Sequence, residues 1–236
     1  MAFSFSPRIV TDGLVLYLDA ANRYSYPGSG TTWNDISRGG NNGTLVNGPT
    51  FDPANGGSIV FDGVDDYVPI QNPISNSSDF TINFWMYYLG GNSQVGLIST
   101  WNTSYQGVGI SFSNYNNNGV WSLRSWANNG ASGGMNWGVL DNLKNVWSNI
   151  TLTFINSNGT QRGYINGMFQ NSESFRNNLI HDTTLQIARG GLSNSAQLSN
   201  YPSANTRISN LQIYNRALTA TEITQNYNAT KTRFGL

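Results

Sequence analysis

The sequence predicts an all-β fold, a sandwich of two antiparallel sheets with one short C-terminal helix. Three observations lead to this expectation. Short runs rich in β-branched and aromatic residues recur along the chain, and clusters of turn-forming residues separate them. Asn is even more frequent than the 26 glycines, and both residue types supply the positive φ angles of tight turns. The aromatic content of 13% is far above that of a chain too polar to form a core.

The strand-like runs indicate about a dozen strands. In the run at residues 80–89, every second residue from Phe80 to Tyr88 is apolar, as in a strand with one buried face. The run at residues 161–172 is divided by Asn166-Gly167, the strongest short signal for a β-hairpin. Other expected strands lie at residues 13–20, 96–100, 107–113, 120–124, 146–155, 183–190 and 206–215.

One helix is expected near the end of the sequence. Thr219 is a suitable N-cap, and Glu222 stands three residues later, which makes a capping box. Leu218 before the cap can pack against Ile223 as a hydrophobic staple. We expect this helix to be short and to pack across the sandwich.

Composition excludes several classes of function. The net charge is zero and only 10% of residues are charged, so we expect no nucleic acid as partner. Cys is absent, which removes cysteine-based metal and redox sites. No apolar run approaches a membrane span, and no membrane partner is expected. The N-terminal segment lacks the pattern of a signal peptide, so export would need another route, such as lysis.

The order of motifs resembles laminin-G-like, concanavalin A-like jelly-roll domains. The opening strand leads to Trp-x-Asp and Asn-Gly-Thr stretches, and "GGSIVFDGVDDYVPI" is similar to the family's most recognisable segment. "FTINFWMY" resembles its first long central strand, "VWSNITLTFINSNGTQRGYINGMFQ" its Trp-led strand and hairpin, and "RISNLQIYNRALTATEI" its closing strand and helix. Because the resemblance covers nearly the whole chain, and no repeat or linker interrupts it, we expect a single domain over residues 1–236.

A looser resemblance concerns the segment "SYPGSGTTW", which is similar to stand-alone domains of tailed-phage virion proteins. It implies a lectin-like protein of the virion surface that serves as a decoration, fibre or adsorption component, with an extracellular location as the alternative. The partners expected from it are a cell-surface glycan, other virion proteins and further copies of the chain. A purely structural particle protein without a sugar ligand remains the alternative function.

Three aspartates, Asp62, Asp65 and Asp66, lie within the segment "FDGVDD". The first interpretation is turn chemistry, since Asp-Gly is a favoured hairpin turn and Asp side chains cap turn N–H groups. The second is a calcium site, because clustered carboxylates suit a hard cation that takes 6–8 oxygens. Asp19, at the end of the opening strand, is a further candidate ligand. The resemblance implies an Asp in the closing strand where this chain has Ser209-Asn210, which weighs against a site involving Asp19.

Enzymatic activity is not expected. Glucanases that share the fold carry a Glu-x-Asp-x-x-Glu strand, and the retaining reaction needs two carboxyl groups about 5 Å apart. This chain has only Glu173, in an expected exposed turn, and Glu222, which the capping box uses. His181 is the one histidine, and we expect a loop or surface position for it.

Aromatic residues inside Asn-, Ser- and Gly-rich segments are the main indication of a binding site. An aromatic face stacks on the C–H face of a sugar, while amides and hydroxyls pair with its hydroxyl groups. The predicted ligand-binding set is Trp101, Asn102, Tyr105, Tyr115, Trp126, Asn128, Trp137 and Tyr201. The alternative is that these aromatic residues cap the core or lie in a subunit interface.

Overall fold

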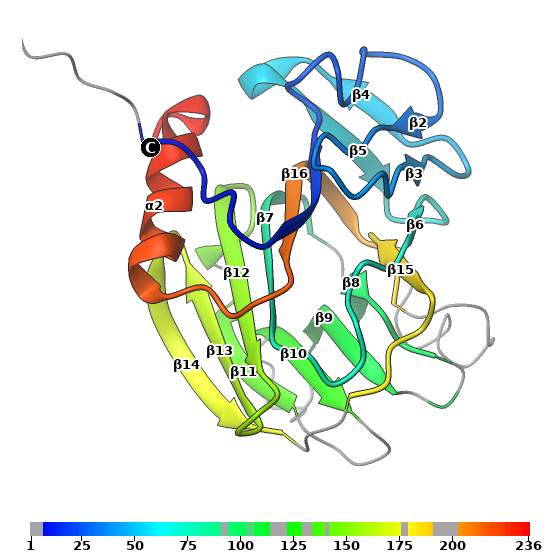
Figure 1. Cartoon of the computed structure of the whole chain (residues 1–236). Coiled ribbons are helices and arrows are strands. Elements are labelled where there is room, and N and C mark those ends of the chain that lie inside the picture. The colour runs from blue at the N-terminus through cyan, green and yellow to red at the C-terminus, as the bar shows by residue number, and fades with distance from the viewer. Residues whose placement is uncertain are drawn as a thin grey trace, which may run out of the picture.

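The computed structural model describes residues 7–90, 94–102, 104, 106–113, 122–128, 134–139, 142–175, 179–190 and 203–236. These residues form two antiparallel β-sheets that pack face to face, with one α-helix on the outside of the first sheet (Figure 1). The prediction of an all-β sandwich with a C-terminal helix is therefore confirmed.

Sheet A is the sheet that carries the helix. From one edge to the other it contains β14 (Met168–Ser174), β13 (Thr160–Ile165), β12 (Trp147–Ile155), β7 (Phe80–Tyr88), β16 (Asn205–Tyr214), β5 (Ser58–Asp62) and β4 (Thr50–Asp52). The first strand, β1 (Leu14–Asp19), pairs with the second half of β16. Because β16 pairs with β1, β5 and β7, it occupies the centre of the sheet.

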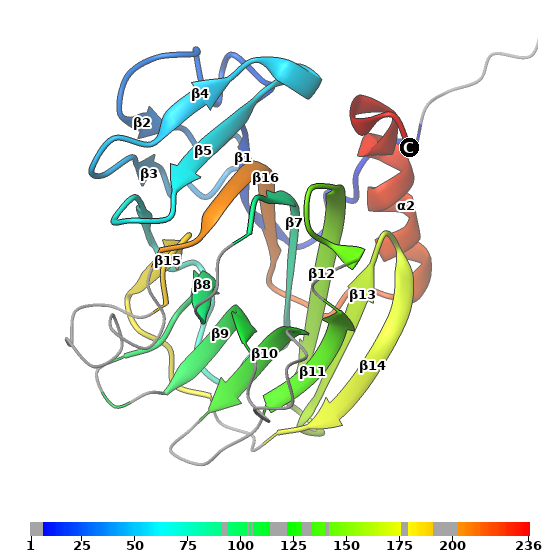
Figure 2. The ribbon, with the colours of Figure 1, turned by 180° about the vertical axis from the view of Figure 1, so that it is seen from behind.

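Sheet B forms the opposite layer, as Figure 2 shows from behind. Its order is β11 (Gly134–Val139), β10 (Ser122–Asn128), β9 (Gly107–Ser113), β8 (Val95–Ser99), β15 (Thr184–Ile187), β6 (Val68–Gln71), β3 (Gly43–Thr44) and β2 (Thr32–Trp33). The edge strand β11 lies against β14, the edge strand of sheet A. On this side of the sandwich the two sheets therefore meet along their edges.

The alternation predicted for residues 80–89 gives β7 two different buried faces. The apolar residues from Phe80 to Tyr88 belong to the main core between the sheets, where the ring centroid of Tyr88 lies 4.3 Å from that of Phe112 on sheet B. The residues between them point to the other face, where Thr81, Asn83 and Trp85 are buried and Tyr87 is half-buried. On that face Trp85 stacks on Phe234 and Tyr227, and its indole N–H donates to Thr230 Oγ1 at 2.8 Å. Helical residues thus cover the outer face of sheet A.

The helix α2 (Ala220–Thr230) has the start that its sequence predicts. Thr219 Oγ1 accepts the N–H of Glu222, and Glu222 Oε2 accepts the N–H of Thr219 at 2.8 Å, so the capping box is present. Leu218 and Ile223 pack in one small apolar cluster, as expected for the staple. A short 3₁₀ turn, η3 (Lys231–Phe234), continues from the helix.

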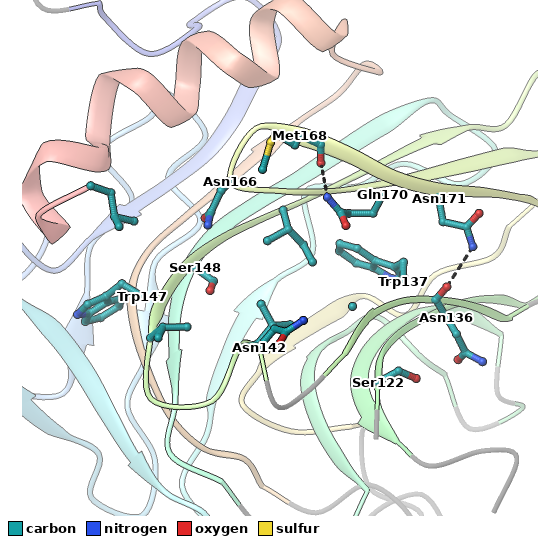
Figure 3. Close-up of a pocket in the computed structure, with 15 residues that line it drawn as sticks. Ser122, Asn136, Trp137, Asn142, Trp147, Ser148, Asn166, Met168, Gln170 and Asn171 are labelled. Atoms are coloured by element: carbon teal, nitrogen blue, oxygen red, sulfur yellow. Dashed lines mark hydrogen bonds between the residues drawn. The ribbon is translucent and has the colours of Figure 1, made fainter. Parts of the chain in front are cut away.

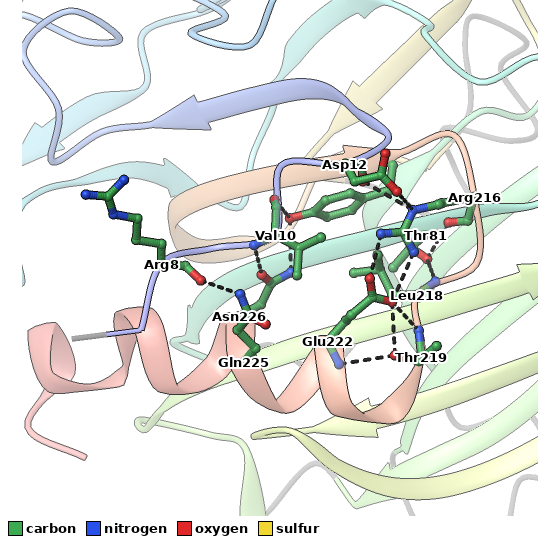
Figure 4. A network of polar contacts seen from close by, with 11 residues as sticks. Arg8, Val10, Asp12, Thr81, Arg216, Leu218, Thr219, Glu222, Gln225 and Asn226 are labelled. Atoms are coloured by element: carbon green, nitrogen blue, oxygen red, sulfur yellow. Dashed lines mark hydrogen bonds and ion pairs between the residues drawn. The ribbon is translucent and has the colours of Figure 1, made fainter. Parts of the chain in front are cut away.

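The N-terminal segment at residues 8–12 lies between helix α2 and sheet A and is hydrogen-bonded to both (Figure 4). The N–H of Val10 donates to Asn226 Oδ1 at 2.8 Å, and the Tyr214 hydroxyl donates to the carbonyl of Val10 at 3.0 Å. Arg216 pairs with both Glu222 and Asp12. The two ends of the described chain therefore meet on the same face of sheet A. No helix among the described residues is long and apolar enough to cross a membrane.

Some expectations about individual elements were wrong. The described residues form sixteen strands, more than the expected dozen, because β2, β3 and β4 are very short and β11 was taken as loop. The segment after Asp62 is not a hairpin, since β5 belongs to sheet A and β6 to sheet B. Glu173 lies in strand β14 rather than in a turn.

Candidate functional site

A pocket of about 680 Å³ lies where the edges of the two sheets meet. We call it the edge pocket (Figure 3). The sheet edges β11 and β14, the start of β12 and the turn between β13 and β14 surround it. Its lining residues are Ser122, Asn136, Trp137, Gly138, Asn142, Leu143, Val146, Trp147, Ser148, Ile165, Asn166, Met168, Gln170, Asn171 and Leu236.

Trp137 of β11 forms the inner wall of the edge pocket. Its ring packs over Gly163 of β13, where an added Cβ would stand 2.6 Å from ring carbon Cδ2. A side chain at residue 163 would displace the indole, so the glycine is what lets the ring fill this position. Only 5% of Trp137 is exposed, which leaves a narrow part of the ring for a ligand. Trp147 stands at the outer end, where it packs on Phe234 at 4.6 Å between ring centroids.

The turn after β13 and the strand β14 that follows it each place an amide side chain at the pocket. Asn166 and Gly167 have φ angles of 52° and 76°, both left-handed, which is the type I′ geometry that an Asn-Gly hairpin favours. Asn166 Oδ1 accepts the N–H of Asn149 at 2.9 Å, and Gln170 Nε2 donates to the carbonyl of Met168 at 3.1 Å. These backbone partners fix which end of each amide is oxygen and which is nitrogen.

A third amide, Asn171, joins the two sheet edges. Its Nδ2 donates to the carbonyl of Asn136 on β11 at 3.0 Å, and its Oδ1 accepts the N–H of Ser172 at 2.8 Å (Figure 3). An exposed edge carbonyl of β11 is thus paired by a side chain of β14, which holds the two walls of the pocket together.

The mouth of the edge pocket is apolar. Val146, Met168 and Leu236 are exposed at 45%, 65% and 50%, although each is aliphatic. None of the lining side chains that the structure describes is ionisable. The Lys144 amine lies close to Gly90, on the chain that follows β7, and is not part of the lining. A ligand here would meet amides and aliphatic carbon rather than charge.

Of the described aromatic residues predicted for ligand binding, Trp101 and Trp126 lie together and Trp137 lies apart from them. Trp101 packs over Gly109, on the face of β9 opposite the core residues Val108 and Ile110, and is buried. Its ring meets that of Trp126 edge to face, with centroids 6.5 Å apart. Trp137 instead lies in the edge pocket and the main core.

The surroundings of Trp126 include a cation. The guanidinium of Arg124 stands 3.6 Å from the centre of the Trp126 ring. Both residues lie on strand β10 and not in a loop, and Trp137 lies on β11, so the expectation of loop positions for these two tryptophans was wrong. Asn102 is half-buried after β8, where its Nδ2 donates to Gln106 Oε1 at 3.0 Å. The side chain of Asn128 and the residues Tyr105, Tyr115 and Tyr201 lie outside the described part of the structure.

Most residues of the edge pocket were not identified from the sequence. The sequence indicates a turn at Asn166, but a turn signal does not indicate a pocket. The one local indication of the pocket is the segment "NGMFQN", in which the apolar residues Met168 and Phe169 follow a tight turn and are otherwise surrounded by polar residues. Large apolar residues on an exposed edge strand indicate a contact surface.

The structure brings together the three aspartates of "FDGVDD". Each offers a carboxylate oxygen, and these oxygens all lie within 4.8 Å of one another. Asp62 Oδ1 accepts the N–H of Val64 at 2.8 Å, and Asp66 Oδ2 accepts the N–H of Asp62 at 3.1 Å. Two of the three aspartates therefore use a carboxylate oxygen to cap backbone N–H groups of the turn, as the first interpretation predicts. Burial, and then the negative charges of Asp62 and Asp65, raise the pKa of Asp66. A donor set of carboxylates fits a hard cation such as Ca²⁺.

Asp19 is not part of this cluster. Both of its carboxylate oxygens pair with the Arg233 guanidinium, at 2.8 and 3.1 Å, and Oδ2 also accepts the Tyr17 hydroxyl at 2.9 Å. Burial alone would lower the pKa of Arg233, but the hydrogen bond and charge of Asp19 outweigh it and raise the pKa. This carboxylate anchors the turn η3 to β1.

His181 is buried, which contradicts a surface position, although it does lie outside any strand. Its Nδ1 is hydrogen-bonded to Thr100 Oγ1 at 2.8 Å, and its ring meets Phe80 edge to face. Burial lowers the pKa of His181 to about 4. A histidine held neutral in this way supports packing, and it lies outside the edge pocket.

Solved structures similar to this fold are binding domains of bacterial toxins. The binding domain of Paraclostridial Mosquitocidal Protein 1 has a TM-score of 0.68 at 20% identity, covering 92% of this chain and 52% of that one. The binding domain of botulinum neurotoxin DC, in complex with rat synaptotagmin II, has a TM-score of 0.72 at 15% identity, covering 94% and 52%. The ligand-binding domain of botulinum neurotoxin serotype D, in complex with N-acetylneuraminic acid, has a TM-score of 0.70 at 14% identity, covering 92% and 51%.

The chain thus spans about half the length of these solved structures, and the likeness shows the fold. No curated protein sequence matches the chain significantly. A laminin G family model, described as the concanavalin A-like lectin/glucanases superfamily, matches residues 62–224, which is more than half of the sequence. Together with the two packed antiparallel sheets, this match shows that the chain belongs to the concanavalin A-like lectin/glucanase superfamily.

Proposed function

We propose that the chain is a non-enzymatic, lectin-like binding protein whose carbohydrate site is the edge pocket. The observation that carries this proposal is the lining, in which amide and hydroxyl groups surround an aliphatic and indole surface without any ionisable side chain. Sugars combine hydroxyl groups with C–H faces, so both parts of the lining have a partner on such a ligand. A volume of about 680 Å³ lies within the usual range of small-molecule pockets.

The solved relatives support a binding role in general terms. They are binding domains, one in complex with N-acetylneuraminic acid and one with a receptor protein. Because this chain corresponds to about half of each, they support ligand binding as a use of the architecture and do not identify a ligand.

A hydrolytic role has less support than binding. Glycoside hydrolysis requires a pair of carboxyl groups beside the scissile bond. Within the described part of the chain, no Asp or Glu side chain lines the edge pocket. Glu222, one of two glutamates, is bound to Arg216 and Thr219 at the start of α2.

We further propose a place on the virion surface, as a decoration, fibre or adsorption component, with other virion proteins and further copies of the chain as partners. The support is the resemblance of the segment "SYPGSGTTW" to tailed-phage domains. An extracellular location is the alternative. Calcium is the candidate cofactor, and the cluster of Asp62, Asp65 and Asp66 is the candidate site for it.

A purely structural particle protein is the second candidate function. The exposed aliphatic mouth of the edge pocket favours it, because exposed apolar patches also mark protein–protein contacts. Trp101 on the outer face of sheet B and Trp137 at the edge pocket are each only 5% exposed, which leaves little of either ring for a sugar to stack on. The two candidate functions differ in whether the purified protein binds sugar.

A glycan array, probed with and without a calcium chelator, tests the proposal. We expect binding by the native chain, and a roughly five-fold loss of affinity in Gln170→Ala, since a lost hydrogen bond costs about 1 kcal/mol. Glu173→Gln, on the same strand but outside the pocket, is the matched control and should bind normally. Loss of binding in Trp126→Ala with retention in Gln170→Ala would move the site to the outer face of sheet B. Binding to no glycan would favour the structural role.

A further inference from the structure

We infer that the edge pocket selects neutral glycans over acidic ones, with Asn166 as hydrogen-bond donor and Gln170 as acceptor to the same sugar. This inference rests on the proposed function and adds the class of ligand. A neutral glycan differs from N-acetylneuraminic acid, the ligand in one of the similar structures, because the carboxylate of that sugar is charged at neutral pH.

The two amides present opposite polarity because each is fixed by the backbone at one end. Asn166 uses Oδ1 to accept the N–H of Asn149, and its Nδ2 has no partner among the described residues. Gln170 uses Nε2 to donate to the carbonyl of Met168, and its Oε1 has none. One N–H donor and one C=O acceptor therefore remain at the same pocket, and the backbone hydrogen bond of each amide lowers the entropy lost when a ligand binds.

A hydroxyl group both donates and accepts, and a secondary amide does so with its N–H and C=O. A neutral sugar with hydroxyl or acetamido groups therefore satisfies Asn166 and Gln170 together. Asn171 does not add to this recognition, because both ends of its amide are already bonded within the chain.

An anionic sugar would lose the hydration of its carboxylate without gaining a countercharge. Among the residues that the structure describes, no Lys, Arg or His side chain lines the pocket, and the amine of nearby Lys144 lies against Gly90 instead. Placing an unpaired charge beside Trp137 and Met168 is unfavourable, because a buried charge needs an opposite charge or several hydrogen bonds. The lining thus favours neutral sugars in two ways, because it offers an amide donor and acceptor and because its described side chains include no cation to pair with an acidic sugar.

The test compares one neutral oligosaccharide from the array with its sialylated form, by biolayer interferometry on the full chain. We expect at least ten-fold weaker binding of the sialylated form, and a neutral affinity that is unchanged between low and high salt, because uncharged contacts are not screened. Asn166→Asp keeps the oxygen that accepts from Asn149 and the left-handed turn, but replaces the free donor by an acceptor. It should lose at least ten-fold in affinity for the neutral ligand.

The control for Asn166→Asp is Asn55→Asp, which alters another asparagine with a left-handed φ, at a distance in sequence and outside the pocket. It should bind like the native chain. Asn142→Arg adds a cation to an exposed lining position and should reduce the ratio of the affinity for the neutral form to that for the sialylated form. Equal or tighter binding of the sialylated form, or full binding by Asn166→Asp, would overturn the inference while the lectin function stands. Binding to no glycan at all would overturn both.

Discussion

The imidazole of His181 is packed against Phe80 and Thr100, with a pKa of about 4. In the unfolded chain a histidine takes up its proton near pH 6.5. Between these two values the unfolded state binds more protons than the folded state, so the free energy of unfolding decreases as pH falls. The contribution is fully present above pH 6.5 and is lost as pH falls to 4.

We therefore expect the native chain to lose on the order of 3 kcal/mol of stability through His181 between pH 6.5 and 4, from 1.36 kcal/mol per pKa unit. His181→Gln should lack this loss, and its remaining pH dependence reports the carboxylates alone, since the sequence has one histidine. Urea unfolding at a series of pH values measures both proteins. Parallel curves for the two would contradict the assignment.

The three aspartates around Gly63 give a second prediction at the scale of residues. Bringing Asp62, Asp65 and Asp66 within 4.8 Å costs repulsion that a bound Ca²⁺ would relieve. We expect millimolar Ca²⁺, but not Mg²⁺, to raise the melting temperature by a few degrees, because a ligand that binds only the folded state stabilises it. Asp65→Asn should weaken the effect and Glu173→Gln should not. No rise in the native chain would leave turn chemistry as the full account of the cluster.

At the scale of elements, helix α2 depends on its first turn. Glu222 carries the capping box and also binds Arg216 through both oxygens, at 3.0 and 2.6 Å, which lowers the pKa of Glu222 to about 2. The helix covers Trp85 and binds the N-terminal segment, so fraying at its start would loosen the outer face of sheet A.

We expect Thr219→Ala to destabilise the fold by about 1 kcal/mol, the usual cost of an N-cap. Thr221→Ala, exposed on the same helix, is the control and should change stability by no more than a few tenths of a kcal/mol. Thermal and urea unfolding of the three proteins measure this. Equal stability of Thr219→Ala and the control would mean that packing alone holds the helix in place.

Elements that a pattern within a few residues specifies could be predicted from the sequence. Elements that depend on pairing with strands distant in the sequence could not. The alternation in β7, the Asn166-Gly167 turn and the capping box are patterns within a few residues, and the structure has all three. The segment after Asp62 contains an equally good local turn signal. It was read as a hairpin because nothing local shows that β5 and β6 pair in different sheets.

At the scale of the whole molecule, the edge pocket illustrates the same limit. It exists because β11 and β14, the outer strands of two different sheets, lie side by side, and strand order is not encoded in any one segment. The sequence predicted that aromatic residues among amides would bind a ligand. Of the described members of that set, Trp137 alone lies at the pocket. Of the amides beside it, Gln170 lies on β14, and Asn166 lies in a turn that its sequence explains by backbone conformation alone.

The position of β16 has a consequence for how the protein is made. This strand is the last along the described chain, yet it pairs with β1, β5 and β7 and so completes the centre of sheet A. During synthesis the earlier strands leave the ribosome with their pairing edges open, and they must wait for β16 before the first layer can close. Contacts so distant in sequence form slowly. The nascent chain therefore passes through a long interval in which exposed strand edges are open to aggregation and to chaperones.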